Sequence, residues 1–367
     1  MVLKWACWGF IVRKNMGDDM TEVIDCNDRI KEIRLEKKLK HSDISNITGY
    51  SPNTVKKWLT DPNSKHYQVA PVQALRLMEQ WLVDGSTSDL VVEKTRGFQA
   101  LAQVWAITNH KGGSGKTTTT INFALMLATQ QSELDPNRKN RVLIVDADFQ
   151  QNATKSLAPF EVKLSISDLL RINESGKTYK YKKVDVSYDG LSIDLIAATS
   201  SMSSDIAGIE GHDLVFALKE ILEWFKPHYD YILIDGLPSK GSWYVSVIAA
   251  ADKVIIPFKP NKFDVWGVSD VFEHVKKLRI RGINNKVRVA AVFCSDVARP
   301  YRVLDKVILE EIEERYPKQY CPTTIRSTIK VKEGCDAFPP QSVVEYDPKH
   351  EASEEYKRVL EFIKNAS

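Results

Sequence analysis

The 367-residue chain has few cysteines, and they have no paired spacing. The five lie at positions 7, 26, 294, 321 and 335, without a CxxC motif. A disulfide framework or a zinc ribbon needs closer pairs, so we expect reduced thiols. An excess of either charge is also lacking, because the net charge is only +3. Any basic surface for nucleic acid must therefore be local. The 43% hydrophobic and 27% charged content is that of a globular chain.

No stretch is long and apolar enough to span a bilayer. The run from Val2 to Val12 is apolar, but it is too short for a membrane helix and lacks the small-residue cleavage site of a secretory signal. Met16 and Met20 follow closely and offer alternative starts. We therefore predict that residues 1–20 are a flexible or misassigned extension and that the protein is cytoplasmic.

The rest of the chain divides into two parts with different periodicity. Residues 21–84 have the pattern of short helices, with apolar residues at near-helical spacing among basic ones and a further helix predicted over 71–83. Residues 85–102 open with Gly-Ser-Thr-Ser-Asp, which is typical of a linker. No internal repeat is present. A small all-α domain over 21–84 therefore precedes a second domain over 103–367.

From residue 103 onward, short apolar runs alternate with helical patterns. The runs cover residues 104–107, 142–145, 191–196, 231–234, 253–257 and 287–293. Continuous apolar strands separated by helices indicate a mostly parallel sheet covered on both faces. The sequence therefore predicts an α/β fold in this part, with ligands bound at the carboxyl ends of the strands.

A glycine-rich loop follows the first of these strands. It comprises Gly112, Gly113, Ser114, Gly115, Lys116, Thr117 and Thr118. Glycines let backbone amides turn toward phosphate oxygens, and the following helix adds its positive end. Lys116 is predicted to reach the β- and γ-phosphates, and the Thr117 hydroxyl to bind magnesium. The strict motif fails at His110, which takes its first glycine position; we interpret His110 as a packing residue rather than a catalytic base.

Two acidic strand ends accompany this loop. Asp146 and Asp148 follow the run 142–145, and Asp235 follows the run 231–234. A carboxylate at a strand tip beside phosphates holds magnesium through water or orients the attacking water. Turns favour aspartate in any case. Two such strand ends downstream of a phosphate loop nevertheless predict a nucleotide hydrolysis site.

These segments resemble the ParA family of partition ATPases, within the ParA/MinD group of deviant Walker ATPases. The resemblance rests on residues 111–118, 142–150, 229–239 and 255–260, and it covers about residue 103 to the end. It implies a P-loop NTPase fold, ATP and Mg²⁺ as cofactors, slow partner-stimulated hydrolysis and an ATP sandwich homodimer. It also implies plasmid or chromosome partition, a ParB-type centromere-binding partner, nucleoid association and no membrane.

The resemblance further implies roles for single residues. Lys111 is the signature lysine that reaches the nucleotide of the opposing subunit, where a second cation stabilises charge on the triphosphate. Together with Lys116, it would take part in catalysis. Asp148 positions the attacking water, Asp146 belongs to the same switch segment, and Asp235 serves magnesium through water. The segment near the adenine contains Pro257, Lys259 and Pro260.

Two positions depart from the family pattern, both in presumed switch segments. Phe149 stands where a proline is usual after the second aspartate, and Gly236-Leu237 separates Asp235 from Pro238. These departures bear on the hydrolysis rate and its coupling to dimer opening. Nucleotide binding does not depend on them.

Residues 42–59 resemble a helix-turn-helix. Gly49 would form the turn, Val55 and Trp58 would pack inward, and Pro52 would begin the recognition helix. The side chains predicted to contact DNA are Asn53, Thr54, Lys56 and Lys57. A small helical bundle used for dimerisation is the alternative. Many ParA proteins bind their own operator through such a domain, so the resemblance implies self-repression.

Non-specific DNA binding in the family uses basic residues on the surface of the ATPase dimer. Arg302 and Lys330 are similar to those positions, although scattered surface charges are the alternative. A MinD-like membrane-cycling ATPase and a nucleotide-sensing repressor also remain open. The former needs an amphipathic terminal helix, but the apolar side chains of residues 354–364 are more consistent with docking on the sheet. The cysteine spacing sets aside an iron–sulfur ATPase.

Overall fold

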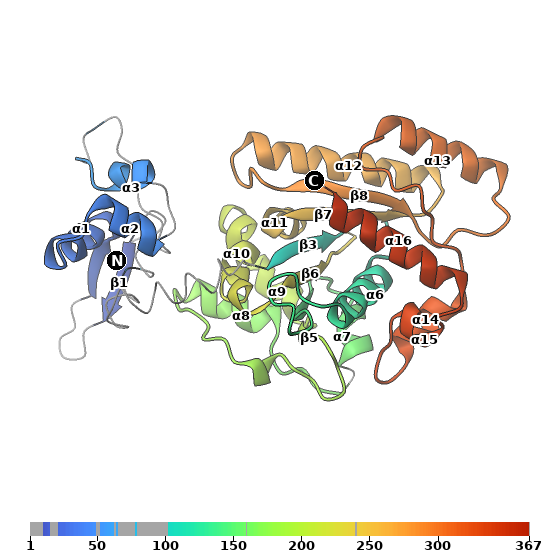
Figure 1. The fold of residues 1–367 in the computed structure, drawn as a ribbon, viewed down its shortest axis with the longest axis horizontal. Coiled ribbons are helices and arrows are strands. Elements are labelled where there is room, and N and C mark those ends of the chain that lie inside the picture. The colour runs from blue at the N-terminus through green and yellow to red at the C-terminus, as the bar shows by residue number, and fades with distance from the viewer. Residues whose placement is uncertain are drawn as a thin grey trace. The chain divides into compact units, whose positions relative to one another are not determined.

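The computed structural model describes residues 10–14, 21–48, 52–61, 64, 78, 102–158, 160–238 and 241–366. The chain forms two compact units, Met1–Phe98 and Gln99–Ser367, and each is described by itself. Figure 1 shows both. The predicted linker 85–102 lies outside the described residues, except for Ala102.

The N-terminal unit combines a hairpin with three short helices. Strands β1 (Phe10–Lys14) and β2 (Thr21–Asp25) pair antiparallel, whereas the sequence predicted no ordered element within residues 1–20 and only helices over 21–84. The helices are α1 (Cys26–Glu36), α2 (His41–Thr48) and α3 (Pro52–Trp58). Val55 and Trp58 are buried with three isoleucines of α1 and α2, which confirms the prediction that they pack inward. The predicted turn at Gly49 and the predicted helix over 71–83, apart from Met78, lie outside the described residues.

The C-terminal unit is built on a six-stranded parallel sheet in the order β5-β4-β6-β3-β7-β8. The strands are β3 (Gln103–Ile107), β4 (Val142–Asp146), β5 (Asp194–Ile196), β6 (Tyr231–Asp235), β7 (Lys253–Phe258) and β8 (Arg288–Cys294). Each of the six predicted runs overlaps one of these strands, although β5 covers only the second half of the run 191–196, and the predicted α/β fold is confirmed. The sheet order places the carboxyl end of β3 between those of β6 and β7, and β4 lies beyond β6.

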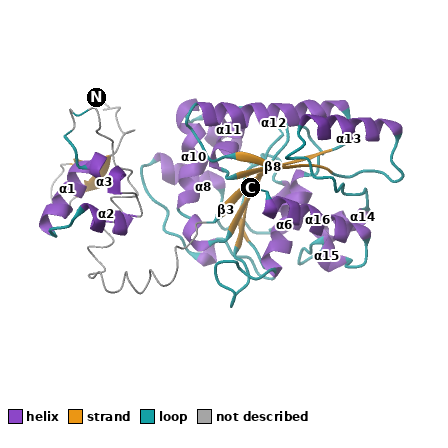
Figure 2. Cartoon of the chain, turned by 45° about the horizontal axis from the view of Figure 1, so that its top comes forward, coloured by secondary structure: helices purple, strands orange, loops and turns teal. Residues whose placement is uncertain are grey.

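Helices cover both faces of this sheet (Figure 2). One face carries α8 (Ile166–Glu174), α9 (Met202–Ala207), α10 (Gly211–Glu223), α11 (Ser242–Ala250), α12 (Lys262–Ile280) and α13 (Val303–Arg315). The other carries α6 (Lys116–Thr129), α7 (Asn152–Leu157), α14 (Ile329–Asp336), α15 (Val343–Tyr346) and α16 (Glu351–Asn365). Two short 3₁₀ helices, η1 (Lys183–Asp185) and η2 (Lys226–His228), also lie in this unit.

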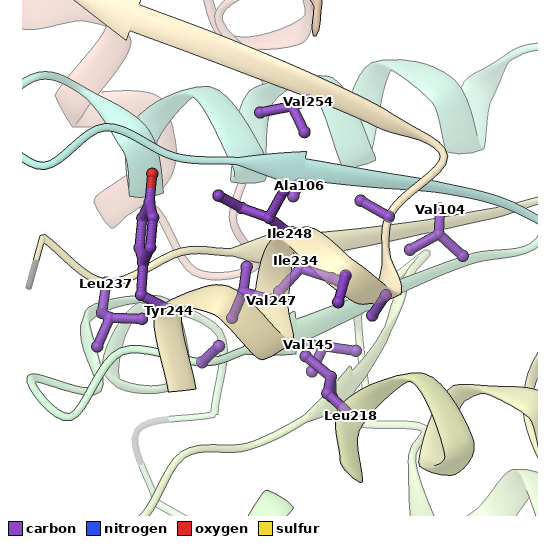
Figure 3. Packing of buried hydrophobic residues seen from close by; sticks show 14 of the residues in the cluster. Val104, Ala106, Val145, Leu218, Ile234, Leu237, Tyr244, Val247, Ile248 and Val254 are labelled. Atoms are coloured by element: carbon purple, nitrogen blue, oxygen red, sulfur yellow. The ribbon is translucent and has the colours of Figure 1, made fainter. Parts of the chain in front are cut away.

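The alternation of side chains along each strand divides the core in two. Val104 and Ala106 of β3 face α10 and α11, where Val247 and Ile248 meet them (Figure 3). Trp105 and Ile107 of the same strand belong to the opposite cluster, under α6 and α16. Both faces of the strand are therefore buried, which explains why its sequence is a continuous apolar run.

The terminal helix α16 docks on the sheet. Val359, Leu360 and Ile363 are buried in the cluster beneath α6, and Lys253 at the start of β7 donates to the carbonyl oxygen of Ile363 at 2.9 Å. This confirms the docking predicted from the sequence. Among the described residues, no helix has both the length and the apolar character needed to cross a membrane.

Candidate nucleotide site

The glycine-rich loop joins the end of β3 to the start of α6. Gly113 and Gly115 have positive φ values of 74° and 85°, in the left-handed region that glycine adopts without strain. Gly115 is also the N-cap residue that directly precedes α6. Behind it, the Ser295 hydroxyl donates to the carbonyl oxygen of Ser114 at 2.8 Å, and a Cβ at Gly115 would lie 3.1 Å from that hydroxyl. The loop is therefore shaped by its glycines and supported from the end of β8.

The two lysines that bracket the glycines have opposite environments. Lys116 is buried, and its ammonium donates to the backbone oxygen of Lys111 at 2.9 Å. Burial lowers the pKa of Lys116, although the neighbouring Asp235 and Asp148 carboxylates oppose this effect. Lys111 is exposed, and its Nζ lies 5.3 Å from the centre of the Phe263 ring on α12. One cation thus faces the interior of the loop, and the other lies on an outer aromatic surface.

Asp235 at the tip of β6 is tied to the first turns of α6. Its carboxylate accepts hydrogen bonds from the hydroxyls of Thr117 at 2.7 Å and Thr120 at 3.4 Å. Asp235 is fully buried. Burial and the neighbouring Asp146 hold the pKa of its carboxyl well above the ordinary value, although the Thr117 bond and Lys116 act in the opposite direction. A cation at this point would favour the ionised carboxylate.

Asp146 and Asp148 lie at the tip of β4, and Asp146 is the register partner of Asp235. The Asp146 carboxylate accepts from the amide and hydroxyl of Thr154, each at 2.8 Å, and from the Asp148 amide at 3.1 Å. Burial raises its pKa to about 6 despite these bonds. Asp148 is also buried, and its Oδ1 accepts from the Gln150 amide at 3.0 Å. The three predicted aspartates therefore gather at one edge of the sheet.

The segment predicted to lie near the adenine supports the loop from the other side. Pro257 is buried within β7, and its carbonyl oxygen accepts from the side-chain Nδ2 of Asn109 at 2.9 Å. Lys259 forms an ion pair with Asp296 at 2.6 Å, and Pro260 is buried. Of these three residues, Pro257 contacts Asn109 at the start of the loop.

Sequence reasoning missed Asn109 as a part of the site. Its side-chain oxygen accepts from the Lys111 amide at 3.2 Å, and its nitrogen bonds Pro257, so Asn109 joins the loop to β7. Gly267 of α12 packs against it, because a Cβ there would lie 2.3 Å from Asn109 Oδ1. Nothing in the local sequence indicates this pairing. Ser295 was also missed, although its place two residues after the predicted run 287–293 was a usable signal.

His110 packs against the helices on the α11 side of the sheet. Its ring centre lies 4.2 Å from that of Tyr244 and 5.5 Å from that of His274. This agrees with the interpretation of His110 as a packing residue. Tyr244 is fully buried, and Figure 3 shows its ring standing between α11 and the strands.

The residues predicted to bind DNA lie in both units. Arg302 is 68% exposed and pairs with Asp305 at 2.8 Å, and Lys330 pairs with Glu333 at 3.0 Å. On α3, Lys56 and Lys57 are exposed, and Asn53 and Thr54 lie in the same helix, with side chains outside the description. The basic side chains are thus at the surface, with acidic neighbours at the two positions in the C-terminal unit.

A parallel sheet with a glycine loop entering α6, a buried lysine and strand-end aspartates defines a P-loop ATPase. The AAA domain family model AAA_31 matches residues 102–289. The chromosome partitioning protein ParA of Myxococcus xanthus is 26% identical over 264 residues, 71% of this chain and 87% of that protein. The sporulation initiation inhibitor protein Soj of Bacillus subtilis is 28% identical over 259 residues, 70% of this chain and 96% of Soj.

Among solved structures, a complex of Cyanothece McdA with ATP superimposes with a TM-score of 0.60 at 20% identity, over 72% of this chain and 96% of McdA. This likeness confirms the fold. The family match and the two relatives show that the chain belongs to the ParA family of P-loop ATPases.

Proposed function

We propose that the protein is an ATP-dependent partition ATPase that segregates plasmid or chromosomal DNA. Its C-terminal unit would bind ATP and Mg²⁺, pair with a second copy around two nucleotides, and bind DNA without sequence preference. The proposal depends most on one observation: Lys116 lies buried on the Lys111 carbonyl at 2.9 Å, beside the carboxylates of Asp148 and Asp235. A phosphate chain in the loop would give this desolvated ammonium an anionic partner.

The donor set at the end of β6 fits Mg²⁺. The Thr117 hydroxyl and the Asp235 carboxylate lie 2.7 Å apart, and both are hard oxygen ligands of the kind Mg²⁺ prefers. We propose that Thr117 binds the ion directly and Asp235 through water. The ion would neutralise charge on the phosphates. Phosphate binding and water orientation are assigned to the protein: the loop amides hold the phosphates, and Asp148 orients the attacking water.

DNA would be bound in two ways. Arg302 and Lys330 would contact phosphates on the ATPase surface, and α3 would read an operator through Asn53, Thr54, Lys56 and Lys57. Support comes from the exposure of the basic residues and from the inward packing of Val55 and Trp58 beneath α3. Self-repression and a ParB-type partner that stimulates hydrolysis complete the proposal.

A membrane-cycling function is less well supported. A helix that binds lipid reversibly must offer its apolar face to the bilayer. Val359, Leu360 and Ile363 of α16 are instead buried under the sheet. Pelleting of the ATP-bound protein with anionic vesicles would favour this alternative over nucleoid association.

The experiment that tests the proposal compares the wild type with Lys116→Ala in ATP turnover and in mass by size-exclusion chromatography. Loss of the buried cation should lower turnover about a hundredfold, the usual effect of removing a preorganised group at the reacting charge. The ATP-dependent increase in mass should also disappear. Lys177→Ala, at an exposed lysine after α8, is the matched control and should behave like wild type. Turnover and dimer unchanged in Lys116→Ala would refute the proposal.

A further inference from the structure

Two large aromatic side chains stand exposed beside the nucleotide loop. Phe263 and Trp266 lie in the first two turns of α12 and are 62% and 63% exposed. Their rings meet edge to face, with centres 5.7 Å apart. Among the tryptophans that the structure describes, Trp58, Trp105 and Trp243 are buried and Trp224 is half-buried, so Trp266 stands apart. Aromatic side chains of this size are enriched at the centres of protein interfaces.

This aromatic pair is held in a fixed position relative to the loop. Asn261 caps α12 by accepting from the Asp264 amide at 3.0 Å, and the Asp264 carboxylate accepts from the Lys259 amide at 2.7 Å. One turn further, Gly267 packs directly against Asn109 of the loop. Phe263 and Trp266 are therefore presented on a surface that cannot move far without disturbing the nucleotide site.

Lys111 links the Phe263–Trp266 pair to the nucleotide loop. Its ammonium lies over the Phe263 ring at 5.3 Å, at the outer surface, whereas Lys116 faces inward. An exposed cation–π contact changes an equilibrium by only about two- to fivefold. Lys111 can therefore leave the Phe263 ring and bind a triphosphate at little cost. The surface that contains Lys111 and Phe263 must then face the molecule that holds this triphosphate.

We propose that Phe263 and Trp266 form part of the surface on which a second copy of this chain docks in the ATP-bound state. The inference rests on the proposed function, because it takes the triphosphate that Lys111 reaches to be the one held by the second copy. When the two copies meet, Lys111 leaves Phe263, and the two aromatic rings become covered by the opposing subunit. The site of each copy is incomplete without the Lys111 of the other.

The test uses the full chain with Mg²⁺ and a non-hydrolysable ATP analogue in sedimentation velocity. The double variant Phe263→Ser, Trp266→Ser should weaken the dimer at least tenfold, while ADP affinity of the monomer stays at the wild-type value. Ile280→Ser is the matched control: Ile280 is 75% exposed at the far end of the same helix, and its loss should leave the dimer unchanged.

Acrylamide quenching gives a second readout that does not depend on a weakened variant. The quenchable signal present in wild type and absent from Trp266→Phe should disappear when the analogue is added. A wild type that stays monomeric would refute the proposed function itself. A wild type that dimerises, with a double variant that dimerises equally well and a Trp266 that stays quenchable, would overturn this inference and leave the function intact.

Discussion

The contact between Gly267 and Asn109 predicts a nucleotide-binding defect from a substitution in a helix. In Gly267→Ala, the new methyl group would lie 2.3 Å from Asn109 Oδ1, so the Asn109 side chain must move. Asn109 is fully buried and makes two hydrogen bonds, from the Lys111 amide and to the Pro257 carbonyl. The Lys111 residue is exposed, so water can replace its lost partner. The buried Pro257 carbonyl has no such replacement.

The magnitude follows from these two environments. Leaving one buried carbonyl without its partner and losing the bond to the loop amide together cost about 2 kcal/mol. Alanine in place of glycine within α12 returns up to about 1 kcal/mol of helix propensity. The free energy of unfolding should therefore fall by only about 1 kcal/mol. The displaced loop should bind nucleotide roughly tenfold to thirtyfold more weakly, since 1.4 kcal/mol is a factor of ten.

Calorimetric titration with a magnesium–ATP analogue, beside urea denaturation, would separate the two effects. Gly208→Ala is the matched control, because a Cβ there meets its nearest neighbour at an ordinary 3.5 Å. Asn109→Ala should reproduce the loss of affinity, and the double variant should be no weaker than either single one, as expected for residues that act through one contact. Wild-type affinity in Gly267→Ala would refute the coupling between α12 and the loop.

Two further predictions concern stability and DNA. The Asp230 carboxylate accepts hydrogen bonds from Arg138 Nη2 at 2.9 Å, from the Ser132 hydroxyl at 2.8 Å and from a backbone amide. Burial tends to raise the pKa of this carboxyl, but the hydrogen bonds outweigh burial and leave the pKa below the ordinary value. Asp230→Asn should therefore lower the free energy of unfolding, measured in urea at pH 7, by about 2 kcal/mol. This difference from wild type should shrink as the pH falls below about 4, because the wild-type carboxylate is then protonated. A difference that does not change with pH would contradict this reasoning. The DNA prediction concerns the double variant Arg302→Ala/Lys330→Ala, measured by fluorescence anisotropy with non-specific duplex DNA. The double variant should reduce the magnitude of the slope of log affinity against log salt by about two, whereas the control Arg315→Ala, at the other end of α13, should leave the slope unchanged. An unaltered slope in the double variant would show that neither residue contacts DNA.

The strands of the ATPase unit were predictable because each is buried on both faces. Their apolar runs therefore mark the strands to within one or two residues in most cases. The exception is β5, predicted over 191–196 and observed over Asp194–Ile196. Asp194 at its start is held by Ser187 and Tyr229, contacts with residues outside that run. Apolar periodicity alone could not reveal where this strand begins.

The site itself was predictable only where its residues are local in sequence. The loop from Gly112 to Thr118 and the strand-end aspartates follow from short motifs. The Asn109–Gly267 contact joins residues 158 positions apart, and no local pattern encodes such a pair. Gly236 is similar: a Cβ there would lie 2.8 Å from the Thr108 side chain and 2.9 Å from the Ile107 carbonyl, so the segment after β6 approaches the end of β3 too closely for a side chain at this position.

The three aspartates at the edge of the sheet all follow apolar runs in the sequence, but they lie in different environments. Asp146 accepts three hydrogen bonds, two of them from Thr154 of α7, so it anchors the segment after β4. Asp235 binds hydroxyls on the first turns of α6, where a cation beside phosphates would be held. Asp148 uses one carboxylate oxygen on the Gln150 amide, within the segment that Asp146 anchors. Its position therefore depends on that anchor, so the proposed role of Asp148 in orienting water would also require the Asp146 carboxylate.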